Sequence, residues 1–363
     1  MKIVIGAGGT GGHLIPAIVL AKHLRRLGHD ISFVGAAKSD GSLITKSGFI
    51  YYRVAGEGFQ SRRWLNRTYV VFTLFKGLLS SVSILRHLKP QVLIGFGGYG
   101  SIPAVLGGRL LRIPCMIHEQ NVIPGKANRL LVKFVQGIAI SFAQTAEHIN
   151  GAKVIVTGCP CHADECDGVS DKKGLYQFFK LSPDKPTILV FGGSQGSHFI
   201  NKMFLETIAD VHKEKGVQVI HISGTDDYPW LKKAYDENGI PVALFSFFDK
   251  MNDAYGVADV IVARAGAVTV SEILSFNKSA LLIPYPYAAE GHQKMNGLVL
   301  ERKGLGKVLE EKDITEESFK EHLFVLLDKH VQREISDVNQ GFNTRHPVEL
   351  LSTALLSLVK SKS

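Results

Sequence analysis

Three glycine-rich segments, and the histidine that follows the first of them, are the parts of this sequence best suited to chemistry. The segments are Gly6–Gly12, Gly95–Gly100 and Gly192–Gly196, and the histidine is His13. Glycine lets the backbone approach a ligand closely, and N–H groups at the start of a helix attract phosphate or a developing anion. Any one segment could be only a tight strand-to-helix turn, but three in one chain predict a phosphate-rich ligand.

The first segment also matches the dinucleotide-binding pattern G-x-G-x-x-G through Gly6, Gly8 and Gly11. A nicotinamide site needs an acidic residue at the end of the second strand, where it holds the ribose. The second predicted strand ends instead at Gly35, and Asp30 stands at its opposite end. The sequence therefore disfavours a nicotinamide site.

We expect His13 to act as general base. It stands at the predicted start of a helix, where the positive end of the helix dipole favours the uncharged imidazole that can accept a proton. Tyr99 and Glu119 come from neighbouring predicted loops and could orient this base or replace it. The alternative is that His13 only caps the helix.

Short apolar runs alternate with helical patterns along both halves of the chain. Such strands are typical of buried parallel sheets, so we predict an α/β fold with two doubly wound, Rossmann-like parallel sheets. The predicted strands are Lys2–Ile5, Ile31–Val34, Tyr51–Val54, Gln91–Ile94, Cys115–His118, Gly137–Ile140, Val154–Thr157, Thr187–Phe191, Val217–Ile222, Val242–Phe245, Asp259–Ala263 and Ala280–Ile283.

A length of 363 residues predicts two domains, because one core rarely grows beyond about 250–300 residues. Ile3–Ile15 aligns without gaps on Ile188–Ile200, which suggests two similar sheets facing each other across a cleft. We predict a first domain of residues 1–157 plus a C-terminal helix at about 340–363, and a second domain of residues 158–339.

The composition is that of a folded protein, because 45% hydrophobic and 21% charged residues exclude disorder and coiled coil. Four cysteines favour a reducing compartment, and the early glycines are unlike a signal peptide. Residues 1–157 carry 19 Lys and Arg against 5 Asp and Glu, whereas residues 158–363 carry 23 against 28. The basic half predicts an anionic partner or a merely solvated surface, and no nucleic-acid-binding motif accompanies it.

The apolar segment Tyr69–Leu85 has 17 residues, the lower limit for crossing a bilayer. Lys76 at its centre makes spanning costly, so we predict a helix between two strands. The stripe expected to pack on the sheet is Val71, Leu74, Phe75, Leu78, Val82 and Leu85. The surplus apolar residues Tyr69, Phe72 and Leu79 lie among Arg62, Arg63, Arg67, Lys76, Arg86 and Lys89, and together they predict reversible docking on an anionic membrane surface.

Several motifs resemble those of one family. They are Gly8–His13 followed by Pro16, Gly97–Ser101, His118–Asn121, Gly192–Gly196 and Arg264–Glu272, with Gln293 and Asn296 further on. The chain resembles the MurG family, bacterial peptidoglycan enzymes that add N-acetylglucosamine to a lipid-linked muramyl-pentapeptide. The motifs extend from residue 8 to residue 296, so the resemblance covers most of the chain. It implies a GT-B fold in which the second domain binds most of the UDP-N-acetylglucosamine.

The resemblance also implies which residues bind substrate. Phe248 would meet the uracil through its backbone, Glu272 would accept hydrogen bonds from the ribose, and Ser194 would lie at the diphosphate. Gln293 and, from the first domain, Asn121 would hold the sugar. Further implied contacts are Thr10, Gly11 and Gly12 in the first domain, and Ala267, Val268, Thr269, Val270 and Ser271 in the second.

The chain departs from the family after Gly158. The family has Asn-Pro-x-Arg there, with the arginine near the donor phosphates, whereas this chain places His162 at the arginine position. A neutral imidazole cannot reproduce the paired hydrogen bonds of a guanidinium. Cys159, Cys161, His162 and Cys166 fit no common zinc spacing, and no Asp-x-Asp pair occurs, so we predict transfer without metal or cofactor.

The resemblance implies an inverting transfer to the 4-hydroxyl of the muramyl residue of undecaprenyl-diphosphate-linked muramyl-pentapeptide. It places the protein at the cytoplasmic face of the bacterial inner membrane, with cell-wall or division proteins as further candidate partners. Three alternatives stay open: another UDP-sugar enzyme of the GT-B fold, such as a glycolipid transferase or an epimerase; a non-catalytic UDP-sugar binder; and a basic nucleic-acid binder.

Overall fold

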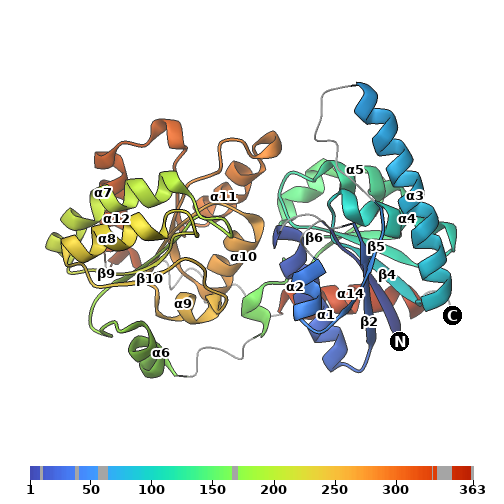
Figure 1. Ribbon diagram of the computed structural model, residues 1–363, viewed down its shortest axis with the longest axis horizontal. Coiled ribbons are helices and arrows are strands. Elements are labelled where there is room, and N and C mark those ends of the chain that lie inside the picture. Colours follow the sequence, from blue (N-terminus) through green and yellow to red (C-terminus); the bar gives the residue numbers. More distant parts are fainter. Residues whose placement is uncertain are drawn as a thin grey trace. The chain divides into compact units, whose positions relative to one another are not determined.

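The computed structural model describes residues 1–8, 11–36, 41–55, 64–165, 171–328, 330–332 and 346–360, without the side chains of residues 41, 64–71 and 360. The chain divides into two compact units (Figure 1). The first unit is Met1–Asp164 with Arg345–Ser363, and the second is Glu165–Thr344. The first unit thus runs past the predicted end at residue 157.

A seven-stranded sheet forms the centre of the first unit, in the order β3-β2-β1-β4-β5-β6-β7 with every neighbouring pair parallel. Its middle strands are buried on both faces because helices cover both sides. The strands are β1 Lys2–Gly6, β2 Asp30–Gly35, β3 Ile50–Arg53, β4 Val92–Gly95, β5 Cys115–Glu119, β6 Gly137–Ile140 and β7 Lys153–Val156.

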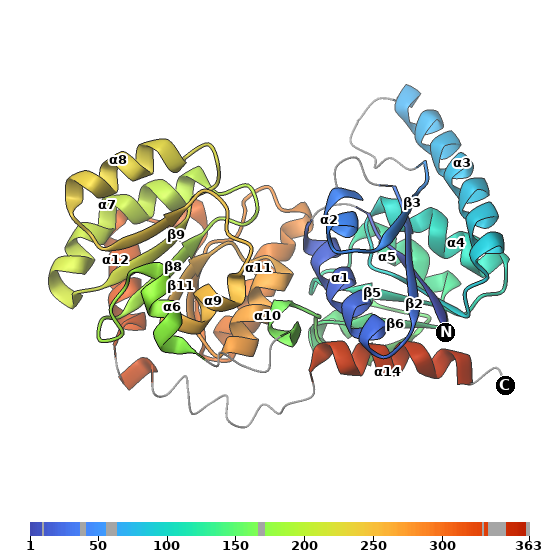
Figure 2. The same ribbon diagram turned by 60° about the horizontal axis from the view of Figure 1, so that its bottom comes forward.

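The helices of the first unit come from both ends of the chain. They are α1 Gly11–Arg26, α2 Gly41–Lys46, α3 Trp64–Leu88, α4 Ile102–Leu110, α5 Lys126–Leu131 and α14 Pro347–Lys360. Figure 2 shows α14 running alongside α1, and its side chains Val348, Leu351 and Leu355 are buried in one core with Ile3 and Leu14. The C-terminal helix therefore completes a core that the N-terminal residues begin.

A six-stranded parallel sheet forms the centre of the second unit, in the order β10-β9-β8-β11-β12-β13. The strands are β8 Thr187–Phe191, β9 Gln218–Ile222, β10 Val242–Phe245, β11 Val260–Ala263, β12 Ser279–Leu282 and β13 Gly306–Val308. The helices are α6 Lys172–Phe179, α7 His198–Lys215, α8 Tyr228–Asn238, α9 Met251–Val257, α10 Ala267–Phe276, α11 His292–Arg302 and α12 Glu316–Leu326.

The predicted fold class is confirmed, and all twelve predicted strands are present, with β13 as an additional edge strand. In both sheets the strand order reverses beside the first strand, between β1 and β4 and between β8 and β11. Ligands of doubly wound sheets bind at this point, outside the carboxyl ends of the strands. The glycine-rich segments follow these strands, so the fold places them at the two positions best suited to a ligand.

The predicted crossover helix is present as α3, but among its described side chains one residue of the predicted packing stripe is exposed. The side chains of Arg67, Tyr69 and Val71, and the residues Arg62 and Arg63, lie outside the described part of the chain. Phe75 is 56% exposed and shares an outer face with Phe72 and Leu79, which are 55% and 57% exposed. At Gly77, α3 lies close to the backbone that follows β3, because an added Cβ would lie 1.9 Å from the carbonyl oxygen of Ala55. Among the described residues, no helix is both long enough and apolar enough to cross a membrane.

Candidate functional site

A cavity of about 490 Å³ lies in the second unit, at the carboxyl ends of β8 and β11. The glycine-rich loop Gly192–Gly196, the start of α10 and Gln293 line it, so it brings together three sets of predicted site residues. Ser194 and Thr269 are among the lining residues. In the loop, Gly196 has φ +80°, and an added Cβ would lie 2.2 Å from the carbonyl oxygen of Ser223, so only glycine fits there.

The start of α10 supplies backbone donors beside this loop. Gly266 precedes the helix without a side-chain cap, and the first backbone hydrogen bond of the helix runs from the Val270 N–H to the Gly266 carbonyl at 2.9 Å. The N–H groups of the first turn have no partner inside a helix and carry its positive dipole end. Of the predicted contacts in this turn, Ala267, Val268, Val270 and Ser271 are buried, and the backbone N–H groups left for a ligand are those that precede the Val270 N–H.

Glu272 lies in the second turn of α10 and is only 4% exposed. The hydroxyl of Tyr255 donates a hydrogen bond of 3.0 Å to its Oε2 atom. Glu272 is not among the cavity-lining residues. Phe248 belongs to an aromatic cluster, with ring centroids 4.8 Å from Phe245 and 5.6 Å from Phe179.

Arg264 lines the cavity and connects several of its neighbouring segments. The sequence did not predict this role. Its Nη2 atom donates to Ser197 Oγ at 2.7 Å and pairs with Glu311 Oε1 at 2.5 Å. Its Nη1 atom donates to two backbone carbonyls just after β12. One guanidinium therefore links Ser197, the residue that caps α7, to the loop that follows β12 and to Glu311. Gln293 accepts a hydrogen bond of 2.8 Å from the Tyr285 N–H through Oε1.

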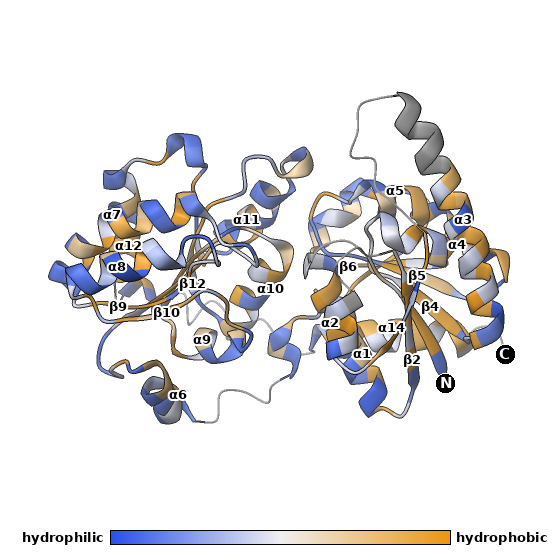
Figure 3. Cartoon of the chain, viewed as in Figure 1, coloured by the Kyte–Doolittle hydropathy of each residue, from blue (hydrophilic) through white to orange (hydrophobic). Residues whose placement is uncertain are grey.

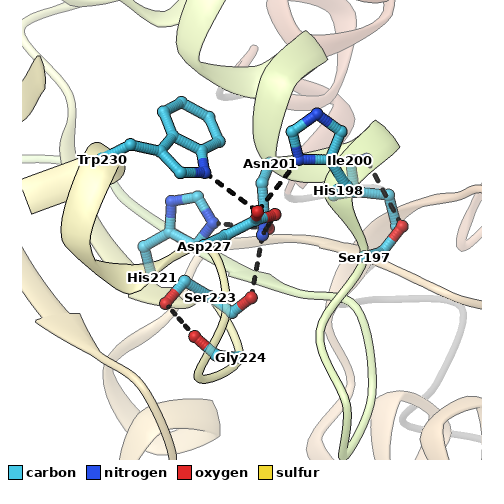
Figure 4. A network of polar contacts seen from close by, with 9 residues as sticks. All are labelled: Ser197, His198, Ile200, Asn201, His221, Ser223, Gly224, Asp227 and Trp230. Atoms are coloured by element: carbon cyan, nitrogen blue, oxygen red, sulfur yellow. Dashed lines mark hydrogen bonds and ion pairs between the residues drawn. The ribbon is translucent and has the colours of Figure 1, made fainter.

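A polar network lies next to the glycine loop, at the start of α7 and the end of β9 (Figure 4). Asp227 accepts hydrogen bonds from Trp230 Nε1 at 2.9 Å and Asn201 Nδ2 at 2.7 Å, and its Oδ1 lies 2.9 Å from His198 Nδ1. Burial raises the pKa of Asp227, but these hydrogen bonds outweigh burial and hold the pKa below its usual value. Asn201 Oδ1 lies 3.0 Å from Nε2 of the buried His221.

The predicted residues of the first unit gather where β1, β4 and β5 end. Nδ1 of His13, at the start of α1, lies 2.8 Å from Oε1 of Gln120. Gly97 and Gly98 have φ of +85° and +70°, and Cβ atoms added to them would lie 3.5 Å from the His13 ring. The loop that carries Tyr99 thus packs its backbone against the imidazole.

Glu119 is 1% exposed, and its carboxylate accepts three hydrogen bonds from the loop that follows β5 and one from α5. Oε1 accepts from the N–H and the side chain of Asn121 at 2.9 and 3.2 Å, and Oε2 accepts from the Gly125 N–H at 2.9 Å and Asn128 Nδ2 at 2.8 Å. This carboxylate therefore orders the loop that carries Asn121 and Gln120.

The structure does not bring every predicted residue to these two places. Gly11 and Gly12 open α1 next to His13, but Thr10 lies outside the described residues. His162 begins a short 3-10 turn, His162–Glu165, at the end of the first unit. Cys159 and Cys161 are buried, and Cys166 lies outside the described residues.

Because His118 and His221 are buried, we predict that the protein loses stability on acidification. Burial lowers the pKa of His118 to about 4 and that of His221 to about 3, whereas an unfolded histidine titrates near 6.5. As the pH falls below about 6.5 the unfolded chain binds protons that the folded units do not, so the free energy of unfolding falls by up to about 1.4 kcal/mol per pH unit for each histidine.

Urea unfolding between about pH 7 and pH 5 measures this slope. His118→Gln and His221→Gln should each show a shallower dependence on pH than the wild-type chain. Equal slopes in all three proteins would contradict the assignment.

Residues 3–140 match the glycosyltransferase family 28 N-terminal domain, and residues 187–344 match the glycosyltransferase family 28 C-terminal domain. Together with the two doubly wound sheets, these matches define the protein as a glycosyltransferase of the GT-B class.

Two curated relatives cover most or all of the chain, and both are named UDP-N-acetylglucosamine–N-acetylmuramyl-(pentapeptide) pyrophosphoryl-undecaprenol N-acetylglucosamine transferase. The one from Thermodesulfovibrio yellowstonii is 33% identical over 100% of both chains. The one from Thermoanaerobacter sp. is 36% identical over 90% of this chain and 91% of its own. The chain belongs to the MurG family, as its motifs predicted.

Solved structures share the fold. The crystal structure of Acinetobacter baumannii MurG has a TM-score of 0.76 at 23% identity and covers 98% of this chain and 99% of its own. A UDP-glucosyltransferase from Polygonum tinctorium has a TM-score of 0.71 at 13% identity and covers 99% of this chain and 98% of its own. The predicted GT-B fold is confirmed.

Proposed function

We propose that this protein transfers N-acetylglucosamine from UDP-N-acetylglucosamine to the 4-hydroxyl of the muramyl residue of undecaprenyl-diphosphate-linked muramyl-pentapeptide, with inversion at the anomeric carbon. The observation that carries the proposal is the cavity of the second unit, where a glycine-rich loop, a helix start and Gln293 converge. Membership of the MurG family supports the choice of substrates.

The second unit binds the donor in this proposal. Backbone N–H groups of the Gly192–Gly196 loop and of the first turn of α10 face the diphosphate, with Ser194 beside it. They stabilise the charge that develops on the leaving UDP, so the step needs no metal. Gln293 reaches the sugar hydroxyls, Glu272 the ribose, and the Phe248 backbone the uracil.

The first unit supplies the base and the acceptor contacts. His13 removes the proton from the attacking hydroxyl, and the Gly97–Ser101 loop, with Tyr99, lies against it. Asn121 reaches the donor sugar, and Glu119 holds the loop of Asn121 in place through its four hydrogen bonds. Thr10, Gly11, Gly12 and His162 complete the proposed contacts.

The proposal is tested by transfer of labelled N-acetylglucosamine to a synthetic lipid-linked acceptor, run with several UDP-sugars and in the presence of EDTA. Labelled product from UDP-N-acetylglucosamine alone, formed equally well with EDTA, is the expected result. Preference for another UDP-sugar would favour a different enzyme of the GT-B class. UDP-sugar binding without product would favour a non-catalytic binder.

We further propose that the protein works as a peripheral enzyme at the cytoplasmic face of the bacterial membrane, in cell-wall growth, cell shape and division. Phe72, Phe75 and Leu79 form an exposed apolar face on α3, and the Lys76 ammonium lies 4.6 Å from the Phe72 ring centroid. Figure 3 shows hydrophobic and hydrophilic residues side by side along the described part of this helix. Apolar and basic side chains together suit an anionic bilayer surface.

Liposome flotation should therefore show binding to anionic vesicles that weakens as salt rises, because each basic residue contributes about 1 kcal/mol and the field decays within about 8–10 Å. The variant Phe72→Ser/Phe75→Ser/Leu79→Ser should lose this binding. The matched control is Leu27→Ser, because Leu27 of the same unit is 54% exposed but lies at the end of α1. Equal binding to neutral and anionic vesicles, or no binding to either, would contradict the docking proposal.

A further inference from the structure

His13 has a defined hydrogen-bond partner on one side of its ring. Its Nδ1 atom lies 2.8 Å from Oε1 of Gln120, a residue 107 positions further along the chain. Gln120 is buried almost completely, and the contact with the half-buried His13 ring is partly shielded from water. A neutral imidazole carries its proton on only one of its two nitrogens. The hydrogen-bond partner of either nitrogen therefore determines which of the two is protonated.

The orientation of the Gln120 amide follows from its other contacts. Its Nε2 atom faces three acceptors: the Phe96 carbonyl at 3.1 Å, the His118 carbonyl at 3.2 Å and His118 Nδ1 at 3.0 Å. A flipped amide would set its oxygen against two carbonyl oxygens, which cannot donate. Oε1 of Gln120 is therefore the atom that faces His13, and it can only accept.

The tautomer of His118 agrees with this orientation. Its Nε2 atom lies 3.0 Å from the Gly158 carbonyl oxygen, which must receive a proton from it. Burial lowers the pKa of His118 to about 4, so the ring is neutral at physiological pH. With its one proton on Nε2, His118 presents a bare Nδ1, which accepts the hydrogen bond from Gln120.

We propose that Gln120 is a positioning residue that holds His13 in the Nδ1–H tautomer and so leaves Nε2 bare as the proton acceptor. The direction of donation runs from His13 Nδ1–H to Gln120 Oε1, from Gln120 Nε2–H to His118 Nδ1, and from His118 Nε2–H to the Gly158 carbonyl. This inference rests on the proposed role of His13 as base. In the reaction Nε2 takes the hydroxyl proton, and the resulting imidazolium keeps its Nδ1–H bond to Gln120.

The loop beside His13 leaves room at the same nitrogen. A Cβ added to Gly97 would lie 3.5 Å from His13 Cε1, and one added to Gly98 would lie 3.5 Å from His13 Cδ2. These two carbons flank Nε2 in the ring. Glycines at both positions therefore keep side chains away from Nε2, the nitrogen that the hydrogen-bond chain leaves bare.

The wild-type protein tests the tautomer directly, without any substitution. In a 15N-histidine-labelled sample the N–H nitrogen and the bare nitrogen of a neutral ring are distinguished by their chemical shifts. The sequence has 14 histidines, and the spectrum of His13→Gln identifies the signals of His13 by their absence. We expect Nδ1 of His13 to be protonated and Nε2 to be bare; the reverse assignment would overturn the proposal.

Gln120→Met keeps the length of the side chain but removes the acceptor. Because His13 can then adopt either tautomer, the Nδ1–H form should lose its dominance, and kcat should fall about 10-fold or more while staying above that of His13→Ala. The donor KM should stay within about 2-fold, because no donor contact is removed. The matched control is Gln136→Met, whose wild-type side chain accepts from the Cys115 N–H in the same unit.

The two readouts separate this inference from the proposed function. An unchanged His13 tautomer in Gln120→Met would overturn the role of Gln120, whatever the kinetics. A changed tautomer with unchanged kcat would overturn the base role of His13, and with it the catalytic part of the inference. An equal loss of kcat in Gln136→Met would show that the effect is one of general packing, and would also overturn it.

Discussion

Replacing His13 by alanine should lower kcat by about 10²–10⁴-fold and leave the donor KM near its wild-type value, because a general base contributes to the transition state and not to donor binding. The cavity proposed for the donor lies in the second unit, whereas His13 belongs to the first. Steady-state kinetics with both substrates varied in turn measure the two effects separately.

A matched control for this variant is His148→Ala. His148 is an exposed histidine of the first unit, at the end of the short turn Ala143–His148. The His148→Ala variant should retain full activity. If His13→Ala instead lost donor binding with kcat preserved, His13 would act only by shaping the glycine-rich loop before α1.

Replacing Glu272 by alanine should raise the donor KM by about 10- to 150-fold, since a hydrogen bond to a charged group contributes about 1.5–3 kcal/mol. The structure buries this carboxylate at 4% exposure and orients it through the Tyr255 hydroxyl. Isothermal titration calorimetry with UDP measures the loss of donor affinity independently of the chemical step.

Two further variants separate charge from folding. Glu272→Gln keeps an acceptor for Tyr255 but lacks the negative charge, so it should lie between wild-type and alanine in donor KM. Glu316→Ala removes an exposed carboxylate from the first turn of α12 and should change nothing. A wild-type donor KM in Glu272→Ala would remove this residue from the donor site.

The sheets could be predicted from the sequence because most of their strands are short apolar runs bounded by glycine or polar residues. The strand β13 was missed because Gly306–Val308 has three residues with a lysine at the centre, too short for a pattern to emerge. On α3, the apolar residues surround much of the helix, and periodicity alone cannot say which of them face the protein. Which residues face the protein depends on contacts with other segments, namely α4 and the backbone at Ala55, which lies close to Gly77.

The loop Gly192–Gly196 of the cavity could also be predicted, since this glycine-rich turn directly follows a strand, and the start of α10 was identified through the motif Arg264–Glu272. The Arg264–Glu311 pair could not, because nothing in the sequence near Arg264 indicates a partner beyond β13. Glu119 and Gln120 show the same limit. Both stand in one motif, but only the tertiary structure reveals that Glu119 accepts four hydrogen bonds and that Gln120 faces His13.

The position of α14 fixes the order in which the nascent chain can fold. The second unit is one continuous stretch of sequence and can close its core while the ribosome is still at work. The first unit needs Val348, Leu351 and Leu355 in the core that α14 shares with α1 and β4, so part of one face of its sheet stays uncovered after residue 164 has been synthesised. At 5–20 residues per second this interval lasts roughly 10–40 s, during which the uncovered apolar face is a target for chaperones.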